Sequence, residues 1–328
     1  MKYSAKDLEH KMIDSHTHAG VSLSYFFDDK YPYCYNCCEI STSIKQAGFD
    51  VACVFPFPSF VCGRAFGDNA LFQDELIKMF ETVPYRSSIS RILTEIKRFN
   101  LTNLLPFGMF SINYSVSEQI HYLDSIVDDL YGLKYYPDAD KRRIIDLKED
   151  GAPFIEFLIK HDLPLVLHVS ENACLYACGF SNVLEAIDLA ETFPLLRICV
   201  AHMGHFSKTA IEKATNKKLD NLFFDVSPLL HICHIRTINK GEVLPLNFGN
   251  PSHVLASLFK LMPDKLIWGS DLPFNFTCNL NNDNHNFSWN EFSLQKNVNV
   301  LFEQEPELIA AICSRNTVNL LFGNHHEN

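Results

Sequence analysis

Two histidines separated by one threonine, with an aspartate two residues earlier, are the first residues in the chain that could do chemistry. They lie in the segment MIDSHTH, which contains Asp14, His16 and His18. In a strand, residues two apart share one face, so these three side chains would project to the same side. A polar face of this kind is costly to bury unless a partner such as a metal ion satisfies it.

Four further titratable residues have a similar place in the sequence. Lys134, His168, His202 and Asp271 each lie at or near the C-terminal end of a segment that is typical of a strand. Taken singly, each has a structural explanation, as a hydrogen-bonded core histidine, a helix cap or a surface lysine. Their shared position argues for a common site. Imidazoles with a carboxylate form a donor set that suits Zn²⁺ or another divalent transition metal.

The elements that must position these residues follow an alternating pattern. Eight short apolar segments alternate with stretches of helical periodicity such as 118–129, 151–162 and 181–193. The apolar segments are 12–18, 50–58, 104–112, 129–137, 163–170, 196–204, 221–228 and 265–274. Such strands, apolar nearly throughout and separated by helices, predict a parallel sheet covered by helices. The count favours an α/β fold of the (β/α)₈ TIM-barrel type over an open doubly wound sheet.

The chain is longer than the roughly 250 residues that such a barrel needs. We assign the surplus to four insertions after strands, at 19–49, 60–103, 229–262 and 275–297. All four would lie on the C-terminal face of the strands, where barrel enzymes build their active sites. No repeat, linker or charge block indicates a second domain. Residues 1–328 are therefore predicted to form a single barrel domain.

The composition excludes several classes of protein. The 328 residues are 47% hydrophobic, and a net charge of −11 without a basic cluster argues against a nucleic-acid partner. The first ten residues lack the apolar run of a signal peptide, and no run reaches the roughly 18 residues of a membrane span. Eleven cysteines without an export signal are expected to be reduced thiols. We therefore expect a soluble, cytoplasmic protein.

Five motifs at the expected strands form a recognisable set. They are IDSHTH at strand one, GLKYYP at strand four, LVLHVS at strand five, VAHMG at strand six and IWGSDLPF at strand eight. In this order and spacing, the chain resembles the amidohydrolase superfamily, and in particular its amidohydrolase-2 branch of metal-dependent hydrolases and decarboxylases. The segment SRNTVNLLFG is similar to the closing helix of that family. The resemblance leaves the substrate open, because many reactions occur on this scaffold.

The resemblance implies roles for individual residues. His16, His18, His168 and Asp271 would hold one divalent metal ion per chain, with Zn²⁺ as the expected metal. His202 would lie beside the metal as a further ligand, a base or a polarising donor. Asp271 would also take a proton from the metal-bound water, whose pKa a divalent ion can lower to roughly 7.

Two residues keep more than one interpretation. Asp14 would hold a ligand or the strand backbone in place, or it is a buried hydrogen-bonding aspartate without a further role. Lys134 corresponds to a lysine that binuclear members of the superfamily carboxylate to bridge two metals. We favour substrate-anion binding or a structural pair for Lys134 over carboxylation. The chain lacks the strand-four glutamate of TatD-like nucleases, which counts against a binuclear phosphodiesterase.

Other polar residues are weaker candidates for substrate contacts. His231 and His234 have i, i+3 spacing, which is more typical of a pair on a helix surface than of substrate ligands. Arg64 and Arg86 lie in the insertion after strand two, and either could grip a substrate carboxylate bidentately. Nothing in the sequence selects between them.

These features predict an enzyme, a metal-dependent hydrolase that uses a metal-activated water to cleave a C–N or C–O bond of a small organic substrate such as an amide, lactone or ester. The alternative reaction is non-oxidative decarboxylation of an aromatic or unsaturated acid. A third alternative, from another class, is an inactive barrel that acts as a binding protein, although the intact ligand set argues against it. The expected partner is a small molecule, with neither nucleic acid nor membrane, and homo-oligomerisation stays open.

Overall fold

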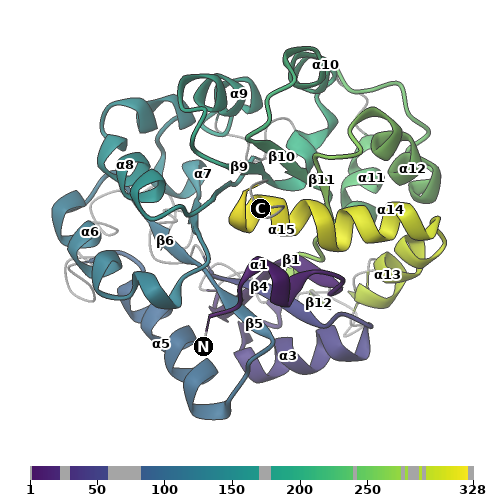
Figure 1. The fold of residues 1–328 in the computed structure, drawn as a ribbon. Coiled ribbons are helices and arrows are strands. Elements are labelled where there is room, and N and C mark those ends of the chain that lie inside the picture. The colour runs from purple at the N-terminus through teal and green to yellow at the C-terminus, as the bar shows by residue number, and fades with distance from the viewer. Residues whose placement is uncertain are drawn as a thin grey trace.

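The computed structural model describes residues 2–22, 30–57, 83–169, 179–238, 242–274, 278–279, 288–289 and 293–323. Short strands form the inner wall of a ring, and helices surround it (Figure 1). The wall strands are β1 (Ile13–Val21), β4 (Val51–Pro56), β5 (Leu104–Pro106), β6 (Gly108–Phe110), β7 (Leu133–Tyr135), β8 (Leu165–Leu167), β9 (Ile198–Val200), β10 (Leu222–Asp225) and β11 (Leu266–Ile267). The predicted α/β barrel is confirmed.

The wall strands pair in parallel and in chain order. One sheet contains β1, β4 and β5, and a second runs from β6 through β7, β8, β9 and β10 to β11. β5 and β6 belong to one segment, in which the Phe107 N–H donates to the Val54 carbonyl at 2.9 Å. A bridge between Thr17 and Leu272 brings the segment after β11 beside β1. The two sheets therefore meet around the ring.

The helices of the ring bury one face each. α8 (Ala152–Lys160), for example, buries Phe154, Ile155, Phe157 and Leu158, as expected for an amphipathic helix on a sheet. The other helices are α1 (Ala5–Leu8), α3 (Cys37–Gln46), α5 (Arg86–Phe99), α6 (Val116–Ser125), α7 (Pro137–Asp140), α9 (Val183–Thr192), α10 (Lys208–Lys217), α11 (Leu229–Ile238), α12 (Pro251–Leu261), α13 (Leu294–Phe302), α14 (Pro306–Ala310) and α15 (Asn316–Phe322).

Alternate residues of the wall strands belong to two different cores. Leu165 and Leu167 pack in the layer between strands and helices, whereas Val166 packs in a second cluster. Cys199, Phe223 and Ile267 of β9, β10 and β11 join Val166 there. Because neighbouring residues of a strand point to opposite faces, the second cluster fills the inside of the ring. Its remaining members include apolar residues of α1 and α15, which lie across one end of the ring (Figure 1).

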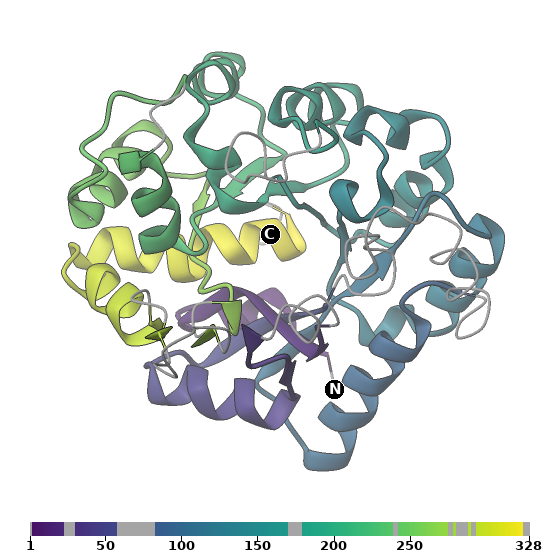
Figure 2. The same cartoon turned by 180° about the vertical axis from the view of Figure 1, so that it is seen from behind.

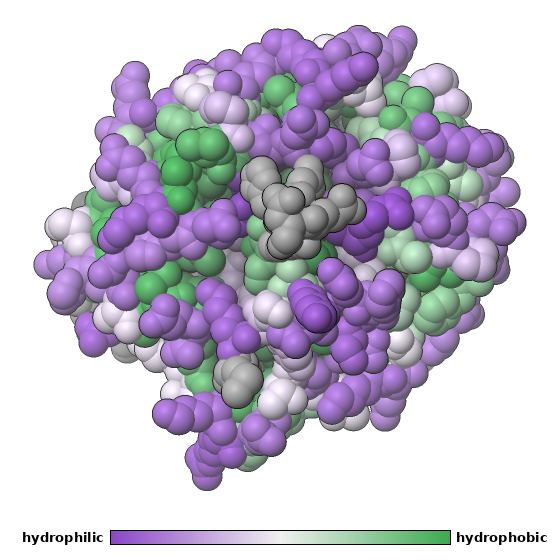
Figure 3. Space-filling view, viewed as in Figure 1, coloured by the Kyte–Doolittle hydropathy of each residue, from purple (hydrophilic) through white to green (hydrophobic). Residues whose placement is uncertain are grey.

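The surface at the α15 end is mostly hydrophilic, and hydrophobic residues occur in scattered patches (Figure 3). Figure 2 shows the opposite end, toward which the wall strands run. In the described part of the chain, no helix combines the length and the apolarity that crossing a membrane requires.

The structure refines the predicted boundaries. The segment 104–112 is divided into β5 and β6, and 196–204 is a strand only over Ile198–Val200. Of the four predicted insertions, 19–49 contains β2 (Lys30–Tyr31), β3 (Cys34–Tyr35) and α3, and 229–262 folds as α11 and α12. Of the segment 275–292, the structure describes only β12 (Cys278–Asn279) and β13 (Ser288–Trp289). Residues 58–82, which include the first part of the second insertion, also lie outside the described residues.

Candidate metal centre and active site

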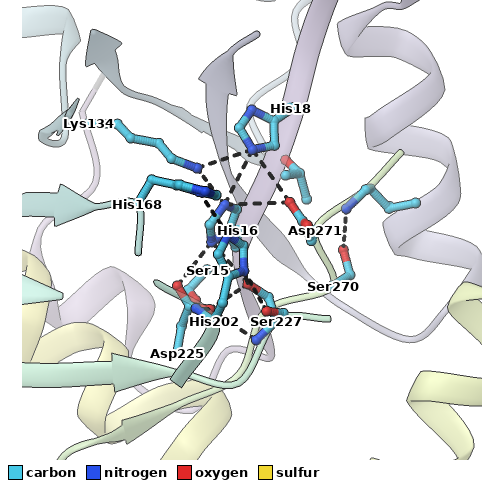
Figure 4. Close-up of polar contacts among 12 residues, drawn as sticks. Ser15, His16, His18, Lys134, His168, His202, Asp225, Ser227, Ser270 and Asp271 are labelled. Atoms are coloured by element: carbon cyan, nitrogen blue, oxygen red, sulfur yellow. Dashed lines mark hydrogen bonds and ion pairs between the residues drawn. The ribbon is translucent and has the colours of Figure 1, made fainter. Parts of the chain in front are cut away.

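Three predicted ligands meet at the C-terminal end of the ring. Nε2 of His16 lies 3.3 Å from Nε2 of His18, and Oδ1 of Asp271 lies 3.6 and 3.5 Å from these two atoms (Figure 4). All three residues are buried, and their ligand atoms lie within 4.8 Å of one another. Strand β1 supplies both histidines, and the segment after β11 supplies the carboxylate.

The hydrogen bonds of both imidazoles fix their tautomers. His16 Nδ1 donates to Asp225 Oδ2 at 2.9 Å, and His18 Nδ1 donates to the Pro56 carbonyl at 3.1 Å. Each ring therefore keeps a lone pair on Nε2, the atom that faces the cluster. Burial lowers the pKa of His16 to about 3 and that of His18 well below its usual range. Two neutral imidazoles and a carboxylate thus point their donor atoms at one place, and this arrangement fits a divalent metal.

Lys134 lies against the same two lone pairs. Its Nζ donates to His16 Nε2 at 2.6 Å and to His18 Nε2 at 3.1 Å. The side chain is fully buried, so the interpretation as a surface lysine is wrong. Burial lowers the pKa of Lys134 to about 8. The Lys134 ammonium lies against the two imidazole nitrogens that a metal ion would use, so a metal ion would compete with it for them.

The close approach of the last strand to the first depends on one glycine. A Cβ on Gly269 would lie 2.6 Å from Cβ of His16 and 3.0 Å from Cβ of Ser227. Two residues later the chain adopts a left-handed conformation at Asp271, with φ of 60°, and the Asp271 N–H donates to the His16 carbonyl at 2.8 Å. Strained backbone of this kind is common where a side chain must be aimed at a site.

Asp14 contacts backbone groups on both sides of this junction. Its Oδ1 accepts the N–H of Ser270 at 2.9 Å and that of His16 at 3.2 Å. Its Oδ2 is buried and has no hydrogen-bond partner among the described residues. Burial raises the pKa of Asp14 to about 7. The side chain joins β1 to the segment that carries Asp271, which is a positioning contact.

His168 and His202 form a second pair beside the cluster. His202 Nδ1 donates to the Ser227 carbonyl at 2.6 Å, so its Nε2 accepts the hydrogen bond from His168 Nδ1 at 3.0 Å. His168 is then left with a lone pair on Nε2. The His168 ring stacks on the Tyr136 ring, with the two ring centroids 3.9 Å apart. His168 does not belong to the three-residue cluster in the described structure, and its role as a fourth ligand stays a prediction.

Asp225 and Ser227 are candidate site residues that the sequence did not single out. Asp225 accepts from His16 Nδ1 and from the backbone N–H groups of His202 and Ser227. Burial acts to raise the pKa of Asp225, but His16, His202 and the Ser227 hydroxyl outweigh it and lower that pKa. The signal was present, because Asp225 is the last residue of β10 and lies at the end of an apolar segment, as the predicted site residues lie at or near the ends of theirs.

The turn that carries His202 has an uncommon backbone. From His202 to Phe206, five consecutive residues have φ between 52° and 61°, and only Gly204 among them is a glycine. A left-handed turn of L-residues costs roughly 1–2 kcal/mol per residue. All five residues are buried, so packing holds the strained turn and with it the His202 ring.

Comparison with protein families gives one match. A family model described as amidohydrolase matches residues 122–322, more than half of the chain. The chain belongs to the amidohydrolase family. This family includes metal-dependent hydrolases and decarboxylases and typically binds a divalent metal ion, and the predicted resemblance is confirmed. Comparison with curated proteins gave no match.

Solved structures share the amidohydrolase fold at low sequence identity. A 2,6-dihydroxybenzoate decarboxylase complexed with 2,6-dihydroxybenzoate has a TM-score of 0.62 at 12% identity over 95% of this chain and 99% of that one. Dihydroorotase from Campylobacter jejuni has a TM-score of 0.55 at 19% identity, over 94% and 82%. An amidohydrolase from Burkholderia multivorans with bound zinc has a TM-score of 0.54 at 14% identity, over 95% and 99%. These similarities establish the fold.

Proposed function

We propose that this protein is a metal-dependent hydrolase that cleaves a C–N or C–O bond of a small organic substrate. One divalent ion, with zinc as the expected metal, would be held by His16, His18, His168 and Asp271. The observation that supports this most strongly is the pair of fixed tautomers, since both Nε2 lone pairs lie beside a carboxylate oxygen. A zinc-bound neighbour of the same fold agrees with this choice of metal.

When bound, a divalent ion lowers the pKa of water and polarises a carbonyl oxygen. The chain must then supply a proton acceptor. Asp271 has one carboxylate oxygen in the cluster, and its side chain keeps 10% exposure while that of His16 keeps none. The second oxygen is therefore the atom that we assign to take the proton from the attacking water.

His202 is the second candidate for this proton transfer. Its Nε2 already accepts a hydrogen bond from His168, so it can take a proton only if that bond is broken. Its Nδ1 is held by the Ser227 carbonyl. We therefore assign His202 to orient His168, so that the Nε2 lone pair of His168 stays available, and Asp271 to act as the base.

A panel assay separates this function from its alternatives. Zinc-loaded protein is incubated with lactones, amides, esters and aromatic carboxylic acids, and both hydrolysis and CO₂ release are measured. We expect hydrolysis of at least one class and its loss in Asp271→Asn. Release of CO₂ without hydrolysis would replace the proposal by a decarboxylase. Absence of both reactions with retained metal would favour a binding protein.

A further inference from the structure

A buried arginine near the mouth of the barrel has no counter-ion among the residues that the structure describes. Arg236 lies on α11 and keeps only 3% exposure, yet its Nε and Nη1 have no hydrogen-bond partner in the described part of the chain. Among the described residues no carboxylate forms an ion pair with it. Burial lowers the pKa of Arg236, and no opposing charge counteracts this effect. An isolated buried charge is among the most costly arrangements in a folded protein, so a missing anion is the natural complement.

The position of α11 connects this arginine with the site. The helix begins at Leu229, four residues after β10 ends at Asp225, and it packs on the left-handed turn that carries His202. On the same helix, His231 is half-buried and lies within the electrostatic reach of Asp271 and His202. His231 is thus more enclosed than a fully exposed helix-surface residue, whereas His234 is exposed as expected.

A second unsatisfied polar atom lies beside the arginine. His205 is buried, and its Nδ1 has no partner among the described residues. Its ring centroid lies 6.1 Å from that of His202. His205 belongs to the turn on which α11, the helix of Arg236, packs, and the charges of His202 and Arg236 add to burial in lowering the pKa of His205. A hydrogen bond at the Val169 backbone engages the other ring nitrogen, so the neutral imidazole keeps a lone pair on Nδ1 and can accept from a hydroxyl or amide of a bound group.

We propose that Arg236 binds the carboxylate of the substrate, so that the enzyme acts on a small organic acid, while the Nδ1 lone pair of His205 can accept from another group of the same molecule. This inference rests on the proposed function. A guanidinium can bind a carboxylate through Nε and Nη2 or through Nη1 and Nη2. Each of these edges contains one of the two unpaired atoms, and each presents two N–H donors to the two carboxylate oxygens. Arg86 is excluded as the anchor because it is exposed on α5, near the Tyr122 ring. Arg64 lies outside the described residues.

Binding of benzoate tests this subsite without any need for catalysis. Benzoate and its neutral isostere benzamide are titrated calorimetrically into the full chain, stripped of metal with a chelator so that no metal can bind the carboxylate. We expect benzoate to bind more tightly than benzamide, and Arg236→Met to weaken benzoate binding roughly 10- to 100-fold. Arg98→Met, which alters an exposed arginine of α5, is the matched control and should bind as the wild type does.

The thermal stability of the ligand-free variant separates binding from a structural role. Since Arg236→Met removes an uncompensated buried charge, its Tm should be higher than that of the wild type. Arg236→Lys should keep the charge and recover part of the benzoate affinity. With a carboxylate-bearing substrate and its methyl ester, Arg236→Met should raise KM for the acid much more than KM for the ester.

Each failure has its own signature. Equal benzoate binding by Arg236→Met and the wild type, no preference for benzoate over benzamide, or a lower Tm of the ligand-free variant would overturn the carboxylate subsite. Tight binding of methylphosphonate without benzoate binding would overturn the assigned ligand class. Arg236-dependent benzoate binding in a protein that hydrolyses nothing would overturn the proposed function and leave this inference standing.

Discussion

Two layers inside the ring differ in chemistry although the same strands form them. Phe223 and Val166 belong to the apolar layer that packs toward α1 and α15. Two residues further along the same strands, Asp225 and His168 face the site. Side chains two apart share one face of a strand, so residues that stabilise the core and residues of the candidate site lie next to each other on the inner face of the same strands. Substitutions in one layer should therefore leave the property of the other largely intact.

Asp271→Asn should give the largest effect. The amide keeps the shape and one coordinating oxygen but cannot accept a proton, so kcat should fall by a factor on the order of 10²–10⁴ while most of the metal is retained. Asp271→Ala should lose metal as well. Steady-state kinetics and elemental analysis measure both quantities, and the exposed Asp264→Asn is the control. Turnover within a few-fold of the wild type would transfer the role of base to His202.

Phe223→Ala probes the apolar layer. Truncating a fully buried phenylalanine typically lowers the free energy of unfolding by about 3–5 kcal/mol. Since the three-residue cluster takes its ligand atoms from His16, His18 and Asp271, the folded Phe223 variant should keep its metal. Urea unfolding and elemental analysis of the folded fraction provide the comparison. Loss of metal from a variant of unchanged stability would show that the two layers are not separable.

The sequence was sufficient for the part of the site that follows strand periodicity. His16, His18 and Asp271 were expected at one mouth of the barrel because each ends a strand, and their ligand atoms lie together. The same rule applies to Asp225, which was overlooked because its segment reads as an ordinary apolar strand. Its importance depends on the His16 tautomer, which only the three-dimensional contact reveals.

Other features have no local signal in the sequence. The left-handed turn from His202 to Phe206 contains four non-glycine residues, so no rule of turn composition predicts it. It exists because tertiary packing outweighs local preference. Arg236 looks like an ordinary helix residue, and only its burial without a counter-ion distinguishes it.

Lys134→Met tests whether the lysine competes with a metal ion at the candidate metal centre. If the ammonium competes with the metal for the lone pairs of His16 and His18, removing it should leave metal content at about one equivalent and tighten binding several-fold, by removing like-charge repulsion. Competition with a chelator measures the affinity. A fall in metal content together with two equivalents in the wild type would instead identify Lys134 as a carboxylated bridge.

The effect that leaves the metal cluster untouched concerns the buried carboxyl of Asp140 on α7. Burial raises the pKa of Asp140 to about 6, and its Oδ2 accepts the Ile112 N–H at 2.8 Å. The folded state therefore holds this proton more tightly than the unfolded state, so stability should fall as the pH rises from about 4 to about 6. Asp140→Asn should reduce this fall by on the order of 3 kcal/mol at most, and Asp14, whose pKa burial also raises, contributes a fall of the same sign.

Urea unfolding at pH 4 and pH 7 checks this difference, with Glu156→Gln on the exposed face of α8 as the control. Identical pH profiles of Asp140→Asn and the wild type would show that Asp140 does not titrate in this window.

The metal content of the purified protein tests the central claim most directly. Elemental analysis of protein prepared without chelator should give about one equivalent of zinc or a similar transition metal per chain. His16→Ala and His18→Ala should each lose most of it and keep the circular dichroism of the wild type, because the barrel core is apolar. A wild type without metal, or variants with full metal content and activity, would contradict the account.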